Sequence, residues 1–193
     1  VQVENESIED LQNDYTEAFI PSHNIVRKEY KNKHKKDDLV EAIIYKIVEV
    51  EAPLHKEIIF KKVADELGYG RVGSNIKYNL EVVINGMESR NIIGQKGGFL
   101  YDKDADVTVR NRENLPNDLR KIEMIAPEEI KKAILETVKL TYGGDVESIV
   151  KEVGRTFGYS RVTENIFDSI NEHVQMLIDE SELTLIDGKI NLP

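Results

Sequence analysis

The most recognisable spacing of residues that could carry chemistry is the run Gly68-Tyr69-Gly70-Arg71-Val72-Gly73, which matches the pattern G-x-G-x-x-G. In a dinucleotide-binding fold this pattern follows a β-strand and opens a helix, and its glycines let the backbone approach a pyrophosphate. Here the run follows a stretch in which apolar residues have helical spacing. A glycine motif outside its structural context is weak evidence, so we interpret this run as a corner between two helices.

Catalytic and metal-binding patterns are otherwise missing from the sequence. It contains no cysteine, which excludes disulfides, thiolate zinc sites and cysteine nucleophiles and fits a reducing cytoplasm. The four histidines lack metal-ligand spacing, and the many acidic residues scatter over predicted helix surfaces. No constellation of a nucleophile, a base and an orienting group can be named. We therefore predict a non-catalytic binding unit that has no cofactor and no metal site.

Length and composition restrict the class of protein. The 193 residues suit one or two domains, and a hydrophobic fraction of 40% is enough for a packed core. No apolar run approaches the roughly 20 residues that a membrane-spanning helix needs, so we expect no membrane contact. The first residues are acidic, unlike a signal peptide, and the chain begins with Val1, so we expect a cytoplasmic fragment of a longer protein. The formal net charge of −10 opposes long-range attraction to phosphate, so any contact with nucleic acid must depend on a local patch.

An internal repeat decides the predicted architecture. The run from Gly68 to Ile76 resembles the run from Gly158 to Ile166 at an offset of 158 − 68 = 90 residues. The same offset aligns apolar residues before and after these runs. The aligned pairs are Ile44 with Ile134, Val48 with Val138, Ile59 with Ile149, Val63 with Val153, Leu67 with Phe157, Leu80 with Ile170 and Met87 with Leu177. This agreement predicts two copies of one module.

Each copy has the pattern of three helices followed by a β-hairpin. In the first copy, helical spacing of apolar residues covers 39–48, 58–67 and 72–87, and two short apolar runs flank the glycine-rich turn at 94–98. In the second copy the predicted helices cover 128–141, 145–157 and 161–180, and an Asp187-Gly188 turn connects the hairpin strands. Three helices and a hairpin are typical of the winged-helix layout, with a helix-turn-helix at the second junction. We therefore predict a mainly α, α+β fold made of two tandem winged helix-turn-helix domains.

The predicted organisation of the chain has four parts. Residues 1–36 form an N-terminal helix and basic arm, 37–101 the first winged-helix domain, 102–125 a linker, and 126–193 the second winged-helix domain. An apolar stripe in the first part indicates an amphipathic helix that packs on a module; its residues are Ile8, Leu11, Tyr15, Phe19 and Ile20. In the linker, Val107-Thr108-Val109 indicates a further strand.

Three segments in this order resemble a known family. They are Val48-Glu49-Val50-Glu51-Ala52-Pro53-Leu54-His55, Gly70-Arg71-Val72-Gly73-Ser74-Asn75-Ile76 and Arg120-Lys121-Ile122-Glu123-Met124-Ile125-Ala126-Pro127-Glu128-Glu129-Ile130. The chain resembles, over residues 40–192, a bacterial domain family of unknown function. That domain lies at the C-terminus of superfamily-one DNA/RNA helicase proteins that carry a very-short-patch-repair-like nuclease domain. The resemblance implies an accessory role in DNA processing or defence against foreign DNA, with upstream helicase and nuclease domains as partners and no catalytic residue here. The family often has a basic residue at position 75, so Asn75 is a departure that weakens the expected contact with DNA.

The third helix of the first copy is the predicted nucleic-acid contact. Side chains opposite its apolar stripe could bond phosphates and base edges from a major groove; these are Arg71, Ser74, Asn75, Lys77 and Tyr78. Lys96 in the hairpin turn could add a contact. The basic run before this copy could follow a duplex through Lys33, Lys35 and Lys36, although a solvated linker explains the run equally well. DNA is therefore one predicted partner.

The second copy has different chemistry at the same positions. Residues 37–101 contain 8 Lys and Arg against 10 Asp and Glu, whereas residues 126–193 contain 7 against 13. In the third helix Glu164 replaces Ser74 and Asp168 replaces Tyr78, so phosphates would repel this face. Phe167 is predicted on the outer face, where it could contact a protein. The alternative function is therefore a protein–protein interaction or homodimerisation module that uses the acidic second domain.

Overall fold

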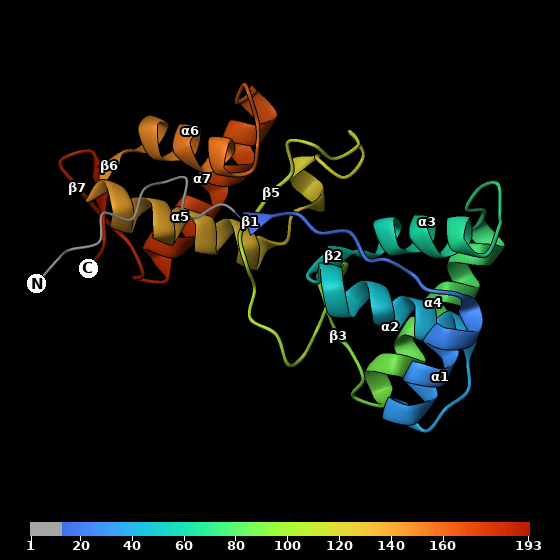
Figure 1. Cartoon of the computed structure of the whole chain (residues 1–193). Helices are drawn as coiled ribbons and strands as arrows, with labels where there is room; N and C mark the ends of the chain where they lie inside the picture. The colour runs from blue at the N-terminus through green and yellow to red at the C-terminus, as the bar shows by residue number, and fades with distance from the viewer. Residues whose placement is uncertain (1–12) are drawn as a thin grey trace, which may run out of the picture. The chain divides into compact units, whose positions relative to one another are not determined.

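The chain divides into two units, each built from α-helices and a small antiparallel sheet (Figure 1). The computed structural model describes residues 13–193. We call Thr16–Asp106 the N-unit, and residues 107–193 together with 13–15 the C-unit. The C-unit is therefore discontinuous along the chain. The described residues form a mixed α/β structure with seven α-helices.

The N-unit contains four helices and a three-stranded sheet. Its elements in chain order are α1 (His23–His34), α2 (Leu39–Glu51), β2 (Leu54–His55), α3 (Lys56–Glu66), α4 (Ser74–Ser89), β3 (Gly94–Lys96) and β4 (Phe99–Tyr101). β4 lies in the middle of the sheet and pairs antiparallel with β2 and β3. The core includes Ile44, Ile59, Ile84 and Leu100, whose side chains have no exposed area.

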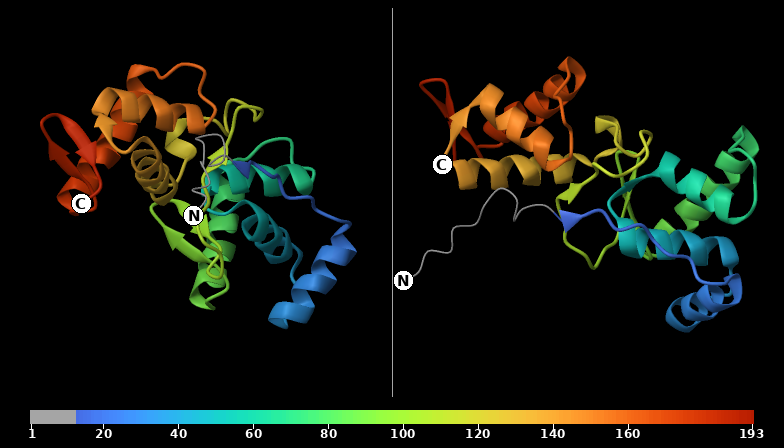
Figure 2. Two further views of the ribbon diagram at one scale, coloured as in Figure 1. Left: turned by 60° about the vertical axis from the view of Figure 1, so that its left-hand side comes forward. Right: turned by 45° about the horizontal axis from the view of Figure 1, so that its top comes forward.

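The C-unit repeats this arrangement after a short preceding segment. Its elements are β1 (Asn13–Asp14), β5 (Arg110–Asn111), the 3-10 helix η2 (Ile122–Met124), α5 (Pro127–Thr141), β6 (Gly144–Asp145), α6 (Val146–Thr156), α7 (Glu164–Asp179), β7 (Thr184–Ile186) and β8 (Lys189–Asn191). β8 pairs antiparallel with β6 and β7, and β1 pairs parallel with β5. The β7–β8 hairpin, drawn in red, lies at the margin of the C-unit in both views of Figure 2.

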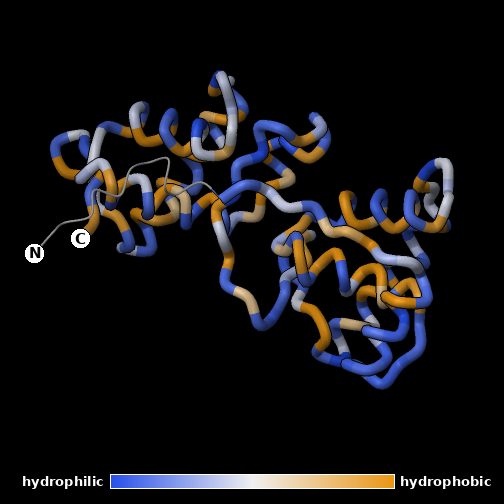
Figure 3. Tube along the Cα trace, in the orientation of Figure 1, coloured by the Kyte–Doolittle hydropathy of each residue, from blue (hydrophilic) through white to orange (hydrophobic). Residues whose placement is uncertain are grey.

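The internal repeat predicted from the sequence is confirmed. α3 begins at Lys56 and α6 at Val146, a difference of 146 − 56 = 90 residues, and the same difference separates α4 from α7 and each strand of one three-stranded sheet from its counterpart. Hydrophobic and hydrophilic residues alternate along the helices of both units (Figure 3). The aligned apolar positions are buried in both cores, except that Leu67 is only half-buried.

Local signals in the sequence account for two helix starts and for the hairpin turn of the C-unit. Asp38 caps α2 because its carboxylate accepts hydrogen bonds from two backbone N–H groups of the first turn. Pro127 occupies the first turn of α5, where a missing N–H costs nothing. Asp187 and Gly188 have φ values of 50° and 77°, as a two-residue hairpin turn requires.

The predicted helix before residue 20 is wrong for its described part. Its stripe comprised Ile8 and Leu11, which lie outside the described residues, and Tyr15, Phe19 and Ile20, which are not helical. The segment is held in place by side chains of α2 and α3. Glu17 pairs with Lys62 at 2.7 Å, and the N–H of Ala18 donates to Glu51 Oε1 at 3.0 Å. The first helix of the described chain begins only at His23.

Much of the predicted linker packs into the C-unit. Val109, Ile122 and Ile125 are buried in the C-unit core. The strand in this segment is β5, which directly follows the predicted Val107–Val109. The prediction was shifted because the side chain of Val109 enters the core, while the next two residues pair with β1.

A buried carboxylate connects this segment to α5. Glu129 is fully buried, and its two oxygens accept hydrogen bonds from the guanidinium groups of Arg110 and Arg112 at 2.6 to 2.8 Å. The ring of Tyr15 lies over both guanidinium groups, with distances of 5.0 and 5.5 Å to the ring centroid. Burial raises the pKa of Glu129, but the charges and hydrogen bonds of Arg112 and Arg110 outweigh burial, so this pKa lies below its ordinary value. The ionised cluster therefore connects β5 to α5, the first helix of the second repeat.

One ion pair occurs in both units with its charges exchanged. In the N-unit, Arg90 Nη2 lies 2.6 Å from Glu41 Oε1. In the C-unit, Lys131 Nζ lies 2.6 Å from Glu180 Oε1, at positions 131 − 41 = 90 and 180 − 90 = 90 residues later. The repeat therefore retains this contact geometry while its charges are reversed. An exchange of α2 and α5 between the units would bring like charges together, which disfavours such an exchange.

We predict that Glu129→Gln destabilises the C-unit by about 3–5 kcal/mol, because it leaves two buried guanidinium groups without a counter-charge. The free energy of unfolding, measured by urea denaturation, tests this value. Glu147→Gln is the matched control, since Glu147 is 68% exposed and, within residues 13–193, pairs only with exposed Lys151; its effect should stay below about 0.5 kcal/mol. Equal effects of the two substitutions would contradict a stabilising role for the buried cluster.

Candidate nucleic-acid interface

The interface begins at the corner between α3 and α4, residues 67–73. Gly68 has a φ of 76°, a left-handed conformation that favours glycine. The N–H of Tyr69 donates to the carbonyl of Ala64 at 2.8 Å and closes the end of α3. The glycine motif therefore follows a helix and not a strand, which confirms its interpretation as a helix corner. A Cβ on Gly70 would meet nothing within 4 Å, so the corner is open.

The corner and the first turn of α4 present four of the five predicted contact residues to solvent. Ser74 and Asn75 are exposed, Tyr78 is 70% exposed, and exposed Arg71 lies just before the helix. Among residues 13–193, no hydrogen bond or ion pair involves Arg71. The cap residue Gly73 has no side chain to satisfy the first N–H groups of α4. A free helix N-terminus next to a guanidinium group attracts negative charge.

The fifth residue, Lys77, is neutralised. Its Nζ pairs with Glu57 of α3, and Glu81, one turn further along α4, pairs with Lys56 at 2.9 Å. These two pairs balance the charges in the middle of α4. Lys96, at the end of β3, is exposed in the hairpin as predicted.

The predicted basic arm is a packed helix rather than an extended segment. Most of the run belongs to α1, whose Val26 and Tyr30 are buried and which packs against α2. All three predicted lysines have partners within the N-unit: Lys33 lies 3.6 Å from Glu49, Lys35 donates to the carbonyl of Asn32, and Lys36 pairs with Glu41. The structure therefore does not bring these lysines together as one free patch.

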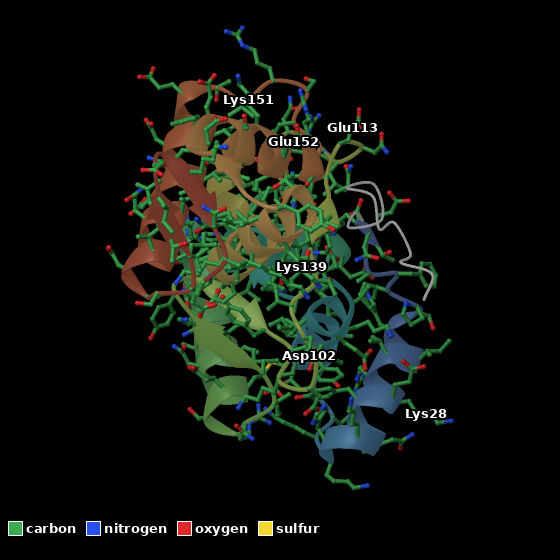
Figure 4. The ribbon with its side chains drawn as sticks, turned by 90° about the vertical axis from the view of Figure 1, so that its left-hand side faces the viewer. Lys28, Asp102, Glu113, Lys139, Lys151 and Glu152 are labelled. Atoms are coloured by element: carbon green, nitrogen blue, oxygen red, sulfur yellow. The ribbon has the colours of Figure 1, made fainter. Side chains whose placement is uncertain are left out.

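A different set of basic residues on α1 reaches solvent. Arg27 and Lys31 share the carboxylate of Asp37, at 2.8 and 3.3 Å. Lys28 points into solvent (Figure 4), and no ion pair within the described chain involves it. Three cations and one carboxylate thus line the same surface. The sequence analysis missed this set because it treated the run as an arm, although the helical spacing of these residues was a usable signal.

An aromatic cluster holds α1 on α2. The ring of His34 lies 4.6 Å from Tyr30 and 4.5 Å from Tyr45, measured between centroids, and its Nε2 is buried with no hydrogen-bond partner in the described chain. Burial lowers the pKa of His34, and the nearby charges of Lys33 and Arg90 lower it further. The packing of α1 therefore favours a neutral imidazole.

The C-unit has the same helix with an acidic face. Glu164, Asp168 and Glu172 are exposed on α7 at intervals of four residues, so they form one stripe. The first two occupy the positions of Ser74 and Tyr78 in α4. Like charges at this spacing repel one another and would repel phosphate. The acidic face predicted for the second copy is confirmed.

The corner between α6 and α7, residues 157–163, is covered. The N–H of Arg112 donates to the carbonyl of Phe157 at 3.1 Å. A Cβ on Gly158 would lie 2.5 Å from the backbone nitrogen of Glu113, so only glycine fits. The hydroxyl of Tyr159 donates to a backbone carbonyl of the same segment, and burial raises its pKa to about 12. The segment 110–120 therefore shields this corner, whereas the equivalent corner of the N-unit is open.

Phe167 does not lie fully on the outer face, and that expectation is wrong. Its side chain is half-buried and packs against the C-unit core. The reason is that its position on α7 lies next to the apolar stripe, so the ring turns inward where Lys77 in α4 turns towards Glu57. The apolar side chains that are exposed in the C-unit lie elsewhere, at Tyr142, Met176, Leu185, Ile186 and Leu192.

Comparison with known proteins finds one partial match. A family model described as protein of unknown function (DUF3320) matches residues 33–78, from the end of α1 to the first turns of α4. The matched segment includes α2, α3 and the open corner. No curated protein and no solved structure matches the chain. Within residues 13–193, no helix has the length and hydrophobicity of a bilayer-spanning segment, and no group of three His, Asp or Glu side chains is placed to hold a metal ion.

We predict that α1 loosens from α2 as the pH falls. The pKa of His34 in the folded N-unit lies below the ordinary value of 6.5, so the unfolded state binds more protons between these two values. The stability from α1 packing is therefore complete above about pH 6.5 and decreases as the pH falls below it. Hydrogen exchange should show lower protection factors for the α1 amides at about pH 5.5 than at about pH 7.5.

Two histidine variants separate this effect from general acid sensitivity. His34→Phe keeps a ring and removes the titration, so the protection of α1 should become nearly independent of pH in this range. Burial also lowers the pKa of His55, which lies on Phe99 in the hairpin. His55→Phe should leave the pH dependence of α1 unchanged. A pH dependence that survives His34→Phe would show that another group is responsible.

Proposed function

We propose that the chain is a tandem winged-helix module whose N-unit engages DNA. The order helix, strand, helix, helix and hairpin, with the first strand added to the hairpin, supports the winged-helix assignment in both units. One observation carries the functional proposal. The helix after the corner begins with exposed, uncharged polar residues in the N-unit and with a carboxylate stripe in the C-unit. Only the first of these faces is compatible with a polyanion.

In the proposed complex, the first turn of α4 enters a groove of the duplex. Arg71 and the uncapped N–H groups of α4 contact phosphate oxygens. Ser74 and Asn75 reach base edges, because a hydroxyl and a carboxamide can both donate and accept hydrogen bonds. Tyr78 contributes a hydroxyl and an apolar ring one turn along. Lys96 on the hairpin contacts a flanking phosphate.

The outer surface of α1 supplies a local attraction for phosphate. It is needed because the overall charge of −10 repels phosphate. Arg27 and Lys31 pair with the carboxylate of Asp37 while Lys28 points into solvent, which leaves this surface locally positive. A local positive surface acts over about one Debye length, so binding should weaken steeply with salt.

We also propose that the chain is a non-catalytic accessory part of a larger bacterial, cytoplasmic helicase–nuclease protein. The family match at 33–78 and the resemblance over 40–192 to helicase-associated C-terminal domains support this context. The motor and nuclease domains would then lie elsewhere in the protein. The role of this chain would be to hold the DNA that those domains process.

We predict that Ser74→Glu combined with Tyr78→Asp weakens binding to a short duplex by about tenfold or more, because it places the carboxylates of the C-unit on α4. Arg71→Ala should weaken binding less and should reduce the slope of log Kd against log salt by about 1. Fluorescence anisotropy with labelled duplex at low salt measures both effects on the whole chain.

Arg161→Ala is the matched control, because Arg161 is exposed at the position of Arg71 in the covered corner of the C-unit. It should leave the affinity unchanged. No binding at high micromolar protein and low salt would refute the proposal. Equal losses from Arg71→Ala and Arg161→Ala would show that general charge, and not the α4 corner, is responsible.

A further inference from the structure

The edge strand of the C-unit hairpin presents two apolar side chains to solvent. β7 is an outer strand of its sheet, and Leu185 and Ile186 on it are 50% and 60% exposed. The corresponding residues of β3, 90 positions earlier, are Gln95 and Lys96. The hairpins of the two units thus differ at two positions of the outer strand, which are apolar in β7 and polar in β3.

The register of the hairpin places these side chains on opposite faces of β7. Leu185 lies opposite Ile190, which is fully buried, so Leu185 extends the apolar core face beyond the core. Ile186 lies opposite exposed Lys189 on the other face. A strand that joined this edge would therefore find an apolar contact on each face.

Backbone groups at this edge are also available. The two-residue turn at Asp187 and Gly188 makes Ile186 and Lys189 the hydrogen-bonded pair that flanks it. The pattern alternates along an antiparallel ladder, so the N–H and C=O of Leu185 point away from β8. No hydrogen bond within the described chain uses them. An unpaired edge of this kind is a template for an added strand.

The charges near β7 decide which strand fits. Exposed Asp179, Glu182 and Asp187 lie in the segment that leads into β7 and in the turn that follows it. Residues 126–193 contain 7 basic against 13 acidic side chains. A second copy of the chain would bring the same carboxylates to the same edge, and like charges oppose that pairing. The complementary occupant is basic.

We propose that the β7 edge binds an extended segment of a partner protein in which apolar side chains alternate with lysine or arginine. The segment pairs with the backbone of Leu185. Its apolar side chains cover Leu185 on one face of the ribbon, and its cations lie among the surrounding carboxylates. This surface is separate from the proposed DNA contact, so failure of one proposal leaves the other standing.

A labelled peptide of alternating lysine and valine is the probe, titrated into the whole chain by fluorescence anisotropy. Backbone NMR shifts should change first at the amides of β7. A lysine–serine peptide tests charge alone, and a glutamate–valine peptide keeps the apolar side chains but reverses the charge; both should bind at least about tenfold more weakly. A lysine–valine peptide with N-methyl groups on alternate residues should also bind weakly, because it cannot add as a strand. Equal binding of the lysine–serine or the N-methylated peptide would overturn the proposal.

The variant Leu185→Gln with Ile186→Lys gives β7 the side chains that β3 already carries, so the hairpin is expected to fold. It should weaken lysine–valine binding by about tenfold or more. Tyr142→Gln is the matched control, because Tyr142 is 91% exposed in the same unit but comes just before β6, the outer strand on the opposite side of the sheet from β7. An affinity that is unchanged in the β7 variant would overturn the proposal. So would a dimer, seen by light scattering, that this variant dissociates, since the edge would then serve self-association.

Discussion

Each unit depends on the burial of one apolar face by helices that are too short to be stable alone. The repeated helices have between 11 and 16 residues, and isolated helices below about 12–15 residues are marginal in water. They persist because α2, α3 and α4, like α5, α6 and α7, close one core with a hairpin. This constraint applies to inward positions alone. Positions outside the core can change much further. The ion pairs Glu41–Arg90 and Lys131–Glu180 are an example, since the contact is retained although its charges are exchanged.

Freedom at outward positions explains how one layout can carry two surfaces of different chemistry. The first turn of α4 carries Ser74 and Tyr78 where α7 carries Glu164 and Asp168. The edge strands differ in the same way, with polar side chains on β3 and apolar ones on β7. These changes leave the core intact, because none of the residues that change belongs to it. A carboxylate stripe repels anions, whereas a face without charge does not.

The two units also differ in what covers the helix corner. In the C-unit, the buried charge of Glu129 holds Arg110 and Arg112, and the backbone that follows lies over Gly158. In the N-unit, the preceding segment runs along α2 and α3, where His23 meets Glu66 at 2.9 Å, and continues into α1. The α3–α4 corner therefore stays open. The accessibility of the corner thus depends on the path of the chain before each repeat.

The sequence by itself determined the repeat, its 90-residue offset, the hairpin turns and the acidic face of α7. These features are local or periodic, so residue type and spacing are sufficient to predict them. Only the tertiary structure decided which charges remain available. Lys33, Lys36 and Lys77 look free in the sequence, but carboxylates neutralise them, and those of Lys33 and Lys77 come from other helices, while Lys28 reaches solvent. It also decided that Phe167 turns inward, that α1 is a packed helix, and that residues 107–125 belong to a core. These outcomes depend on long-range contacts, which spacing along one segment does not specify.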